Sequence, residues 1–319
     1  MAESINTVRV GRILEITTTI GLGTLIFEGT GALLLAIRFI PEFGLGQGIW
    51  YSVFHSVSAF CNAGFDLMGV KAPFSSLVSY SDDALVCVTI MLLIILGGLG
   101  FLVWDDVRQK GLHWRRYDLQ TKLVLVMTLA LILGGALLFF LIERNRMNAD
   151  MPLGEQILVS FFSAVTPRTA GFNSVDTAAL SDASKLLTVI LMFIGGSPGS
   201  TAGGIKTTSV AVVLVFLFSG IRGRRGAYVF GRRIPDDAMK RTGMIVSTNL
   251  ILALCGALVL CGTQSLPLSD VLIETFSAIG TVGMSTGITR ELTNFSALIV
   301  ALLMYCGRVG SVSFAMALL

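Results

Sequence analysis

One motif occurs three times in this chain, and each copy carries a glycine at the same place. The copies are residues 54–66, 161–173 and 275–285. In each, a Ser-Ala pair in an apolar run leads to a small residue, then the glycine, then a bulky apolar residue. The glycines are Gly64, Gly171 and Gly283. Every copy lies between two long apolar stretches, so the repeat predicts a unit of helix, short re-entrant segment, glycine turn and helix.

The composition places this unit in a membrane. A mean hydropathy of +0.81, with 54% hydrophobic and 13% charged residues, excludes an ordinary soluble domain. Stretches long enough to cross a bilayer are expected at residues 13–40, 84–104, 121–142, 184–219, 243–262 and 295–319. Shorter apolar runs lie at 49–61, 155–166 and 268–280. We therefore expect an all-α polytopic membrane protein with three helix–loop–helix units, residues 1–107, 108–220 and 221–319.

The basic residues predict the orientation of these units. Two connecting segments, residues 105–120 and 220–241, hold 11 of the 23 Lys and Arg residues. Basic loops favour the cytoplasmic side, so the glycine turns are expected to enter from outside. The basic segments have two interpretations: topology signals that contact membrane lipid, or a docking surface for a cytosolic partner. Nothing in them indicates nucleic-acid binding.

Catalytic and metal chemistry have no support in the sequence. The chain contains no nucleophile elbow, Walker loop or dinucleotide fingerprint, and it shows no secretory signal peptide. His55 and His113 are far apart and offer no ligand cluster. Five cysteines lack metal-type spacing, and we expect reduced packing residues. The protein is not expected to be an enzyme or to bind a cofactor.

The repeated glycines favour an ion filter. Backbone carbonyls can replace the hydration shell of a cation, and glycine permits the backbone angles that turn successive carbonyls the same way. The short helix before each loop directs its partly negative C-terminal end at the pore. Neutral loops favour a large monovalent ion, K⁺, over a divalent metal. The alternative is that these glycines only allow close helix packing. The predicted filter residues are Asn62, Ala63, Gly64, Phe65, Thr169, Ala170, Gly171, Phe172, Thr281, Val282, Gly283 and Met284.

Five motifs together resemble the Trk/Ktr/HKT family of potassium transporters, and the bacterial TrkH/KtrB type of membrane subunit most closely. They are NAGFD (62–66), TPRTAGFNSVD (166–176), GGSPGSTAGGIKTTS (195–209), TVGMSTGIT (281–289) and GRVG (307–310). The resemblance implies helix–pore-loop–helix units around a central ion pore in a bacterial inner membrane. It also implies a homodimer, a cytosolic nucleotide-binding regulatory subunit of the TrkA/KtrA type, and potassium as the substrate. Sodium can accompany it in either of two roles: as a coupled ion, as in a symporter, or as a regulatory ion.

The family has four such units, whereas this sequence shows three, which correspond to family units two, three and four. Either the sequence is a fragment of a longer chain or the first unit is absent. In the plant relatives that unit carries the Gly/Ser choice linked to potassium or sodium preference. Three functions therefore stay open: potassium uptake, sodium permeation, and a non-conducting or truncated paralogue with an assembly role. An alternating-access carrier lacks a plausible substrate pocket.

The apolar stretch 184–219 contains a segment that cannot form a regular helix, because it is rich in glycine and includes Pro198. Broken helices mark ion pathways in transporters, and the resemblance gives this segment a gating role below the filter. A static kink is the alternative. The predicted gating residues are Gly195, Gly196, Ser197, Gly199, Ser200, Thr201, Gly203, Gly204, Lys206 and Arg308.

Three cations are expected within the membrane. We expect Lys206 and Arg308 to be the most deeply buried charges, where each repels a cation in the closed pore or binds carbonyls of the gating segment. The alternative for both is snorkelling to the membrane surface. Arg168 is expected to brace its filter loop from behind, with Asp176 or Asp66 as its partner. The glycines at 97, 98 and 100 predict a hinge or a close helix crossing.

Overall fold

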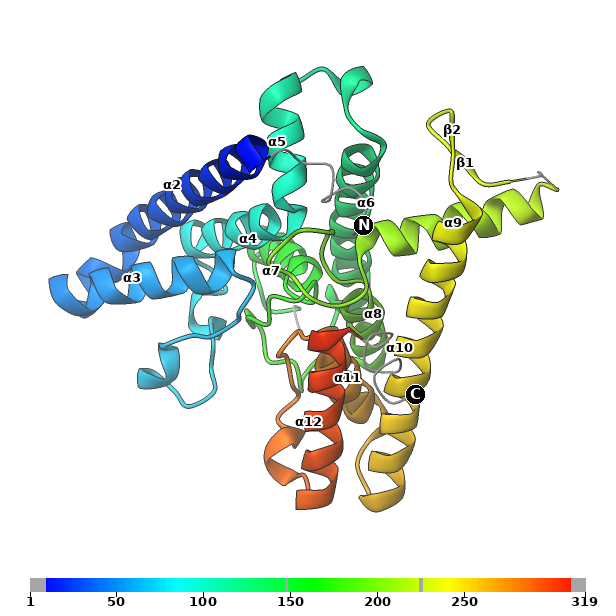
Figure 1. The fold of residues 1–319 in the computed structure, drawn as a ribbon. Helices are drawn as coiled ribbons and strands as arrows, with labels where there is room; N and C mark the ends of the chain where they lie inside the picture. The colour runs from blue at the N-terminus through cyan, green and yellow to red at the C-terminus, as the bar shows by residue number, and fades with distance from the viewer. Residues whose placement is uncertain (1–9, 147–148, 224–225, 311–319) are drawn as a thin grey trace.

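The computed structural model describes residues 10–146, 149–223 and 226–310 of the chain. Nearly all of them lie in helices or in the loops between helices, and a few form one small two-stranded ribbon. Figure 1 shows the helices arranged around short helices and loops in the middle of the molecule. The helical membrane fold is therefore confirmed, and the ribbon was not anticipated.

The first unit contains a long helix, a short apolar helix and a bent pair. The elements are α2 (Val10–Phe43), α3 (Leu45–Phe60), η1 (Met68–Val70), η2 (Val78–Tyr80), α4 (Ala84–Leu99) and α5 (Phe101–Lys110). The short helix α3 ends directly before the first glycine loop, as the repeat predicts.

The second unit repeats this order. Its elements are η3 (Trp114–Arg116), α6 (Leu119–Glu143), α7 (Leu153–Val165), α8 (Asp182–Phe193) and α9 (Thr207–Ile221). The helix expected over 184–219 is broken between α8 and α9, so the interruption predicted from the glycines is confirmed.

The third unit begins with the ribbon, in which Tyr228 pairs antiparallel with Arg233. Its elements are β1 (Tyr228–Val229), β2 (Arg232–Arg233), α10 (Asp236–Thr263), α11 (Leu268–Gly280), η4 (Ile288–Glu291) and α12 (Asn294–Val309). The final nine residues of the stretch expected over 295–319 lie outside the described residues.

Length and hydropathy support fewer simple membrane spans than the sequence predicted. Within the described part of the chain, three helices are long and apolar enough to cross a bilayer: α2, α6 and α10. The straight span expected over 84–104 is wrong, because α4 ends at Leu99 and α5 leaves at an angle of 89°. Gly100 makes this bend with φ of 93°, a value that side-chain-bearing residues rarely adopt. The hinge expected at these glycines is thus confirmed.

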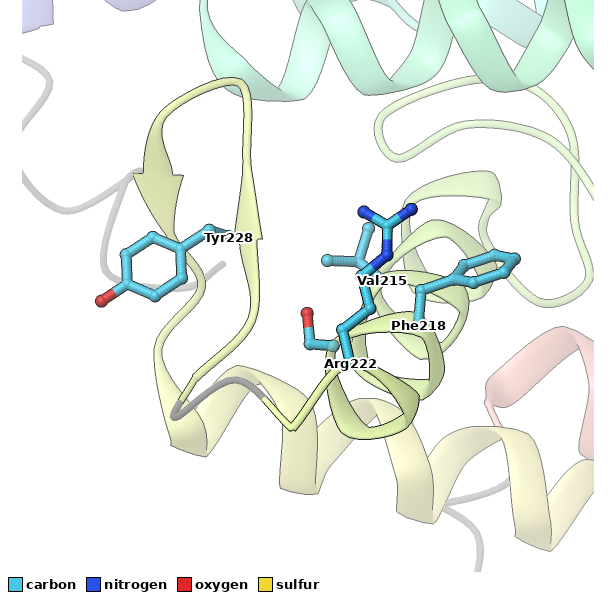
Figure 2. A pocket seen from close by; sticks show the side chains of 5 residues that line it. Val215, Phe218, Arg222 and Tyr228 are labelled. Atoms are coloured by element: carbon cyan, nitrogen blue, oxygen red, sulfur yellow. The ribbon is translucent and has the colours of Figure 1, made fainter.

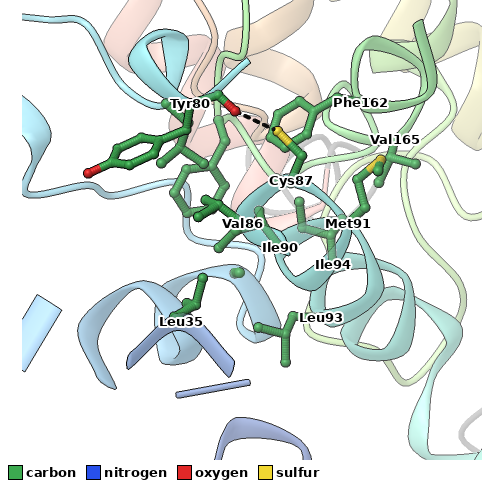
Figure 3. Packing of buried hydrophobic residues seen from close by; sticks show 14 of the residues in the cluster. Leu35, Tyr80, Val86, Cys87, Ile90, Met91, Leu93, Ile94, Phe162 and Val165 are labelled. Atoms are coloured by element: carbon green, nitrogen blue, oxygen red, sulfur yellow. Dashed lines mark hydrogen bonds between the residues drawn. The ribbon is translucent and has the colours of Figure 1, made fainter. Parts of the chain in front are cut away.

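The largest apolar core joins the first unit to the second. Figure 3 shows Ile90 and Ile94 of α4 packed near Phe162 and Val165 of α7. At its edge the Cys87 thiol donates to the carbonyl oxygen of Tyr80 over 3.1 Å. All five cysteines are free thiols, but only Cys87 and Cys306 are buried. The core therefore holds the short helix α7 against the preceding unit.

An ion pair positions the third short helix. Lys185 Nζ of α8 lies 2.8 Å from Asp270 Oδ1 in the first turn of α11, and both side chains are largely buried. A carboxylate in the first turn is also favoured by the helix dipole. The second and third units are thereby joined at the beginning of α11.

Close packing of α4 on α3 gives a stability prediction. A Cβ atom on Gly97 would lie 1.9 Å from the carbonyl oxygen of Phe60. Gly97→Ala should therefore destabilise the protein by about 1–3 kcal/mol, the usual range for overpacking. Gly134→Ala is the matched control, because nothing lies within 4 Å of its added Cβ in α6. Thermal unfolding in detergent measures both; equal melting temperatures for the two variants would contradict the close packing.

Candidate ion-conducting site

The three glycine loops share one backbone conformation. In each loop the glycine and the residue two positions before it both have positive φ. Only glycine adopts such angles without a side-chain penalty. The values are 51° and 71° for Asn62 and Gly64, 70° and 87° for Thr169 and Gly171, and 54° and 90° for Thr281 and Gly283. Left-handed Asn and Thr residues are strained and persist only where the surroundings hold them. The sequence repeat thus corresponds to a structural repeat.

The short helices hold these loops by their last turns. The carbonyl oxygens of Ser58, Thr166 and Ser277 accept loop N–H groups at 2.9, 3.3 and 2.9 Å, from Ala63, Gly171 and Val282 respectively. Each loop therefore begins at the C-terminal, partly negative end of its helix. This is the arrangement that the filter interpretation requires.

Side-chain hydroxyls brace the same loops from behind. Ser58 Oγ donates to the carbonyl oxygen of Phe65 at 2.7 Å, and Thr166 Oγ1 donates to that of Phe172 at 2.6 Å. In the third loop Ser277 Oγ accepts the N–H of Gly283 at 3.1 Å. The repeated Ser-Ala pair thus supplies a brace in the first and third loops, and Thr166 supplies it in the second.

Neighbouring loops lie in direct contact at the glycines. A Cβ atom on Gly64 would lie 2.2 Å from the carbonyl oxygen of Ala170, and one on Gly171 would lie 2.4 Å from that of Val282. The first loop therefore abuts the second, and the second abuts the third. All three predicted filter segments are brought together, and at Gly64 and Gly171 no side chain fits.

The third loop has open space where the other two have a neighbour. Nothing lies within 4 Å of a Cβ atom added to Gly283. Beside it is a cavity of about 430 Å³ that reaches Ala63 and Phe65 of the first loop. The loops thus form three sides of a ring, and this cavity lies between its third and first members.

The segment that the sequence predicts to be a gate, residues 194–206, is a closed loop between α8 and α9 and is called the gating segment below. Its two ends pair at Ile194 and Ile205, and Gly195 N–H donates to the carbonyl oxygen of Ile205 at 2.9 Å. Lys206 Nζ donates back to the carbonyl oxygen of Ala202 at 2.7 Å. The segment has its own internal hydrogen bonds, and the predicted gating residues 195–206 lie together in it.

The bend between α4 and α5 holds the gating segment in place. Backbone N–H groups of Ser197 and Thr201 donate to the carbonyl oxygens of Gly98 and Gly97 at 3.0 and 3.3 Å, and Phe101 N–H donates to Gly199 at 2.9 Å. The sequence predicted a hinge here but not this contact. The hinge of the first unit is therefore the docking place for the broken helix of the second.

The gating segment also reaches the filter. Asn62 Nδ2 donates to Thr201 Oγ1 at 3.2 Å, and a Cβ atom on Gly203 would lie 1.8 Å from Thr281 Oγ1. Two of the three loops therefore rest on this segment, each through its left-handed residue.

Arg168 is buried, and its expected partners are wrong. Its side chain is 6% exposed, and Nη2 donates to Thr128 Oγ1 of α6 at 3.3 Å. Asp66 and Asp176 instead accept local N–H groups, from Met68 at 2.9 Å and Ala178 at 3.0 Å. These carboxylates stabilise turns, so Arg168 braces its loop through α6.

Arg308 differs from its expected burial. It is exposed along the cavity beside Gly283, whereas Lys206 is partly buried. Within the described residues, the contacts recorded for Arg308 include no hydrogen bond to the gating segment. Both roles considered for this residue, repulsion of a cation and binding of carbonyl groups in the gating segment, therefore stay predictions.

Two polar residues at equivalent helix positions were missed in the sequence. His55 Nε2 accepts the N–H of Leu67 at 3.2 Å, and Glu274 accepts Ser285 Oγ at 2.8 Å and Thr289 Oγ1 at 2.6 Å. Both lie three residues before the Ser-Ala pair and hold the chain after a glycine loop. A polar residue at this position of the repeat was the available signal.

A further pocket lies away from the loops, at the end of α9. Figure 2 shows Arg222 beside Val215 and Phe218 on α9, and Tyr228, on the neighbouring ribbon, also lines the pocket. Its volume is about 330 Å³. The pocket does not touch the filter, so it belongs to the surface of the basic segment.

In the part of the chain that the structure describes, no group of three His, Cys, Asp or Glu side chains could hold a metal ion.

Comparison with known proteins agrees with this geometry. Residues 3–319 match the TrkH family, described as a cation transport protein. The chain is 37% identical to a potassium/sodium uptake protein, NtpJ, of Enterococcus hirae, over 100% of this chain and 70% of the relative. It is 35% identical to Ktr system potassium uptake protein B of Bacillus subtilis, over 98% of this chain and 69% of the relative.

The fold matches a solved structure as well. The potassium transporter TrkH from Vibrio parahaemolyticus superposes with a TM-score of 0.73 at 17% sequence identity, over 94% of this chain and 63% of that chain. The chain thus spans somewhat under two thirds of the solved protein. At this identity the likeness concerns the fold, while the family match covers nearly the whole sequence. The chain is a multi-pass membrane protein that belongs to the TrkH family of cation transport proteins.

Proposed function

We propose that this chain forms part of a potassium-uptake pore whose filter is built from the three glycine loops. The observation that carries the proposal is the contact between neighbours, in which the carbonyl oxygens of Ala170 and Val282 lie against Gly64 and Gly171. Carbonyl oxygens in adjacent loops can surround a dehydrated cation. The filter residues are neutral, which favours a monovalent ion. Relatives named for potassium uptake support the same substrate.

The cavity beside Gly283 is the place where a fourth loop would complete the ring. It is bordered by the first and third loops, and the family resemblance implies four loops around one axis. The units 1–107, 108–220 and 221–319 are proposed as three of the four. Potassium is the substrate in this proposal, sodium is a coupled or regulatory ion, and no cofactor takes part.

Two alternatives stay open. One is a non-conducting protein with an assembly role. The name of the enterococcal relative, a potassium/sodium uptake protein, favours sodium permeation. Uptake measurements with each ion separate the three functions.

The basic segments are proposed to lie in the cytoplasm of a bacterial cell, below the inner membrane. Trp114 and Phe230 bring the two segments together, with ring centroids 6.3 Å apart. Two basic segments in contact would suit a cytosolic regulatory subunit with an acidic face, while Arg222 at the end of α9 suits lipid phosphate. A homodimer remains an expectation from the family.

The filter proposal is tested at Gly171. A serine there must adopt φ of 87° and place its Cβ against the carbonyl oxygen of Val282. Because such backbone strain costs about 1–3 kcal/mol, Gly171→Ser should lower the potassium-to-sodium uptake ratio by about tenfold. Growth of a potassium-uptake-deficient bacterium on low potassium, with uptake rates of both ions, is the measurement.

Gly154→Ser is the matched control, because Gly154 lies on the same unit in α7 with nothing within 4 Å of an added Cβ. It should grow and select normally. Normal growth and an unchanged ion ratio in Gly171→Ser, at equal membrane levels, would rule out the filter.

The charge on Arg308 gives a second test. Arg308 lines the cavity beside Gly283, and a cation passing there meets its positive charge. Arg308→Gln should therefore raise the basal potassium flux several-fold, whereas Arg308→Lys, which keeps the charge, should conduct like the wild type. Flux into proteoliposomes at matched protein density measures this. Equal flux in all three proteins would show that Arg308 is only an anchor, and raised flux in both variants would favour a latch made by the guanidinium.

A further inference from the structure

The gating segment and the filter share one hydroxyl group. Thr201 Oγ1 accepts a hydrogen bond from Asn62 Nδ2 at 3.2 Å and donates one to the carbonyl oxygen of Phe60 at 3.0 Å. Phe60 is the last residue of α3, and Asn62 lies two residues before Gly64. A single side chain of the gating segment therefore binds both the end of the short helix and the loop that follows it.

Asn62 depends on this contact. Its backbone is left-handed, with φ of 51°, and its side chain is 8% exposed. Among the described residues its Oδ1 atom has no hydrogen-bond partner. The bond from Nδ2 to Thr201 is thus what orients the buried amide. Because a left-handed asparagine needs support from its surroundings, losing Thr201 should let this loop relax.

The third loop rests on the same segment at the equivalent residue. Thr281, also left-handed with φ of 54°, packs against Gly203 so closely that no Cβ fits there. Asn62 and Thr281 belong to loops on the two sides of the cavity beside Gly283. The gating segment therefore contacts the filter on both sides of its open part.

We propose that Thr201 is a specificity-determining residue through which the gating segment sets ion preference as well as flow. In its observed position the segment holds Asn62 and Thr281, and with them the carbonyl groups around Gly64 and Gly283. This support is kept while ions pass, so a weaker contact between the segment and the two loops reduces the preference for potassium over sodium. This inference rests on the proposed potassium pore and adds regulation to the same site.

The contrasting possibility is a segment that only blocks the path. A pure obstruction would touch the filter without holding it, so weakening the contact would change the rate for both ions equally. The ratio of potassium to sodium uptake therefore separates the two, since rate alone responds in either case.

Thr201→Val tests the proposal, because valine has nearly the same shape and can neither accept from Asn62 nor donate to Phe60. Initial uptake of K⁺ and of Na⁺ is measured in proteoliposomes that contain the full-length protein. Loss of the hydrogen bond that orients Asn62 alone corresponds to a fall of about threefold to tenfold in the potassium-to-sodium ratio. Thr201→Ala should give the same fall, and Thr201→Ser, which keeps the hydroxyl, should restore the wild-type ratio.

Ser200→Ala is the matched control. Ser200 Oγ donates within the segment, to the carbonyl oxygen of Ser197 at 2.6 Å, so its loss can change the rate but should leave the ion ratio as in the wild type. An unchanged ratio in Thr201→Val would overturn the proposal, and so would an equal fall in Ser200→Ala. A wild-type protein that takes up no potassium would overturn the proposed function together with this inference, whereas a selective wild type with an unaltered Thr201→Val ratio overturns the inference alone.

Discussion

Contact between backbone atoms of neighbouring loops is the constraint on which this structure depends. The Cα atoms of Gly64 and Gly171 lie against carbonyl oxygens of the next loop, at places where any side chain would collide. Such an approach requires loops of matched shape, and each has the same two left-handed positions. The short helices, their hydroxyl braces and the ion pair between Lys185 and Asp270 all serve to hold the loops in this relation.

The same constraint connects the filter to the rest of the chain. The bend at Gly100 turns the first unit so that its carbonyl groups hold the gating segment, and that segment contacts Asn62 and Thr281. The bend, the segment between α8 and α9, and the first and third glycine loops are thus in continuous contact. A change in α9 has a short physical path to the glycine loops, through the segment that precedes α9.

Much of this arrangement could be predicted from local sequence patterns. The third short helix was expected over 268–280 and is Leu268–Gly280, because a run of apolar residues and a following glycine define it locally. The broken helix was expected for the same reason, since glycine and proline act on their own backbone. The contact of Thr201 with Asn62 joins residues 139 positions apart, and no periodicity reports on such a pair. The error at Arg168 has a similar cause: a nearby carboxylate was the obvious partner, but the fold places Thr128 of α6 beside it.

Location of the ion itself is the most direct test of the central claim. Rubidium can replace potassium in a filter of carbonyl groups and scatters X-rays anomalously. A crystal of the full-length protein grown with rubidium should show anomalous density on the axis that Ala63, Ala170 and Val282 surround, and the density should weaken when sodium replaces rubidium. Density elsewhere in the membrane region, with none beside these three residues, would contradict a filter built from the glycine loops.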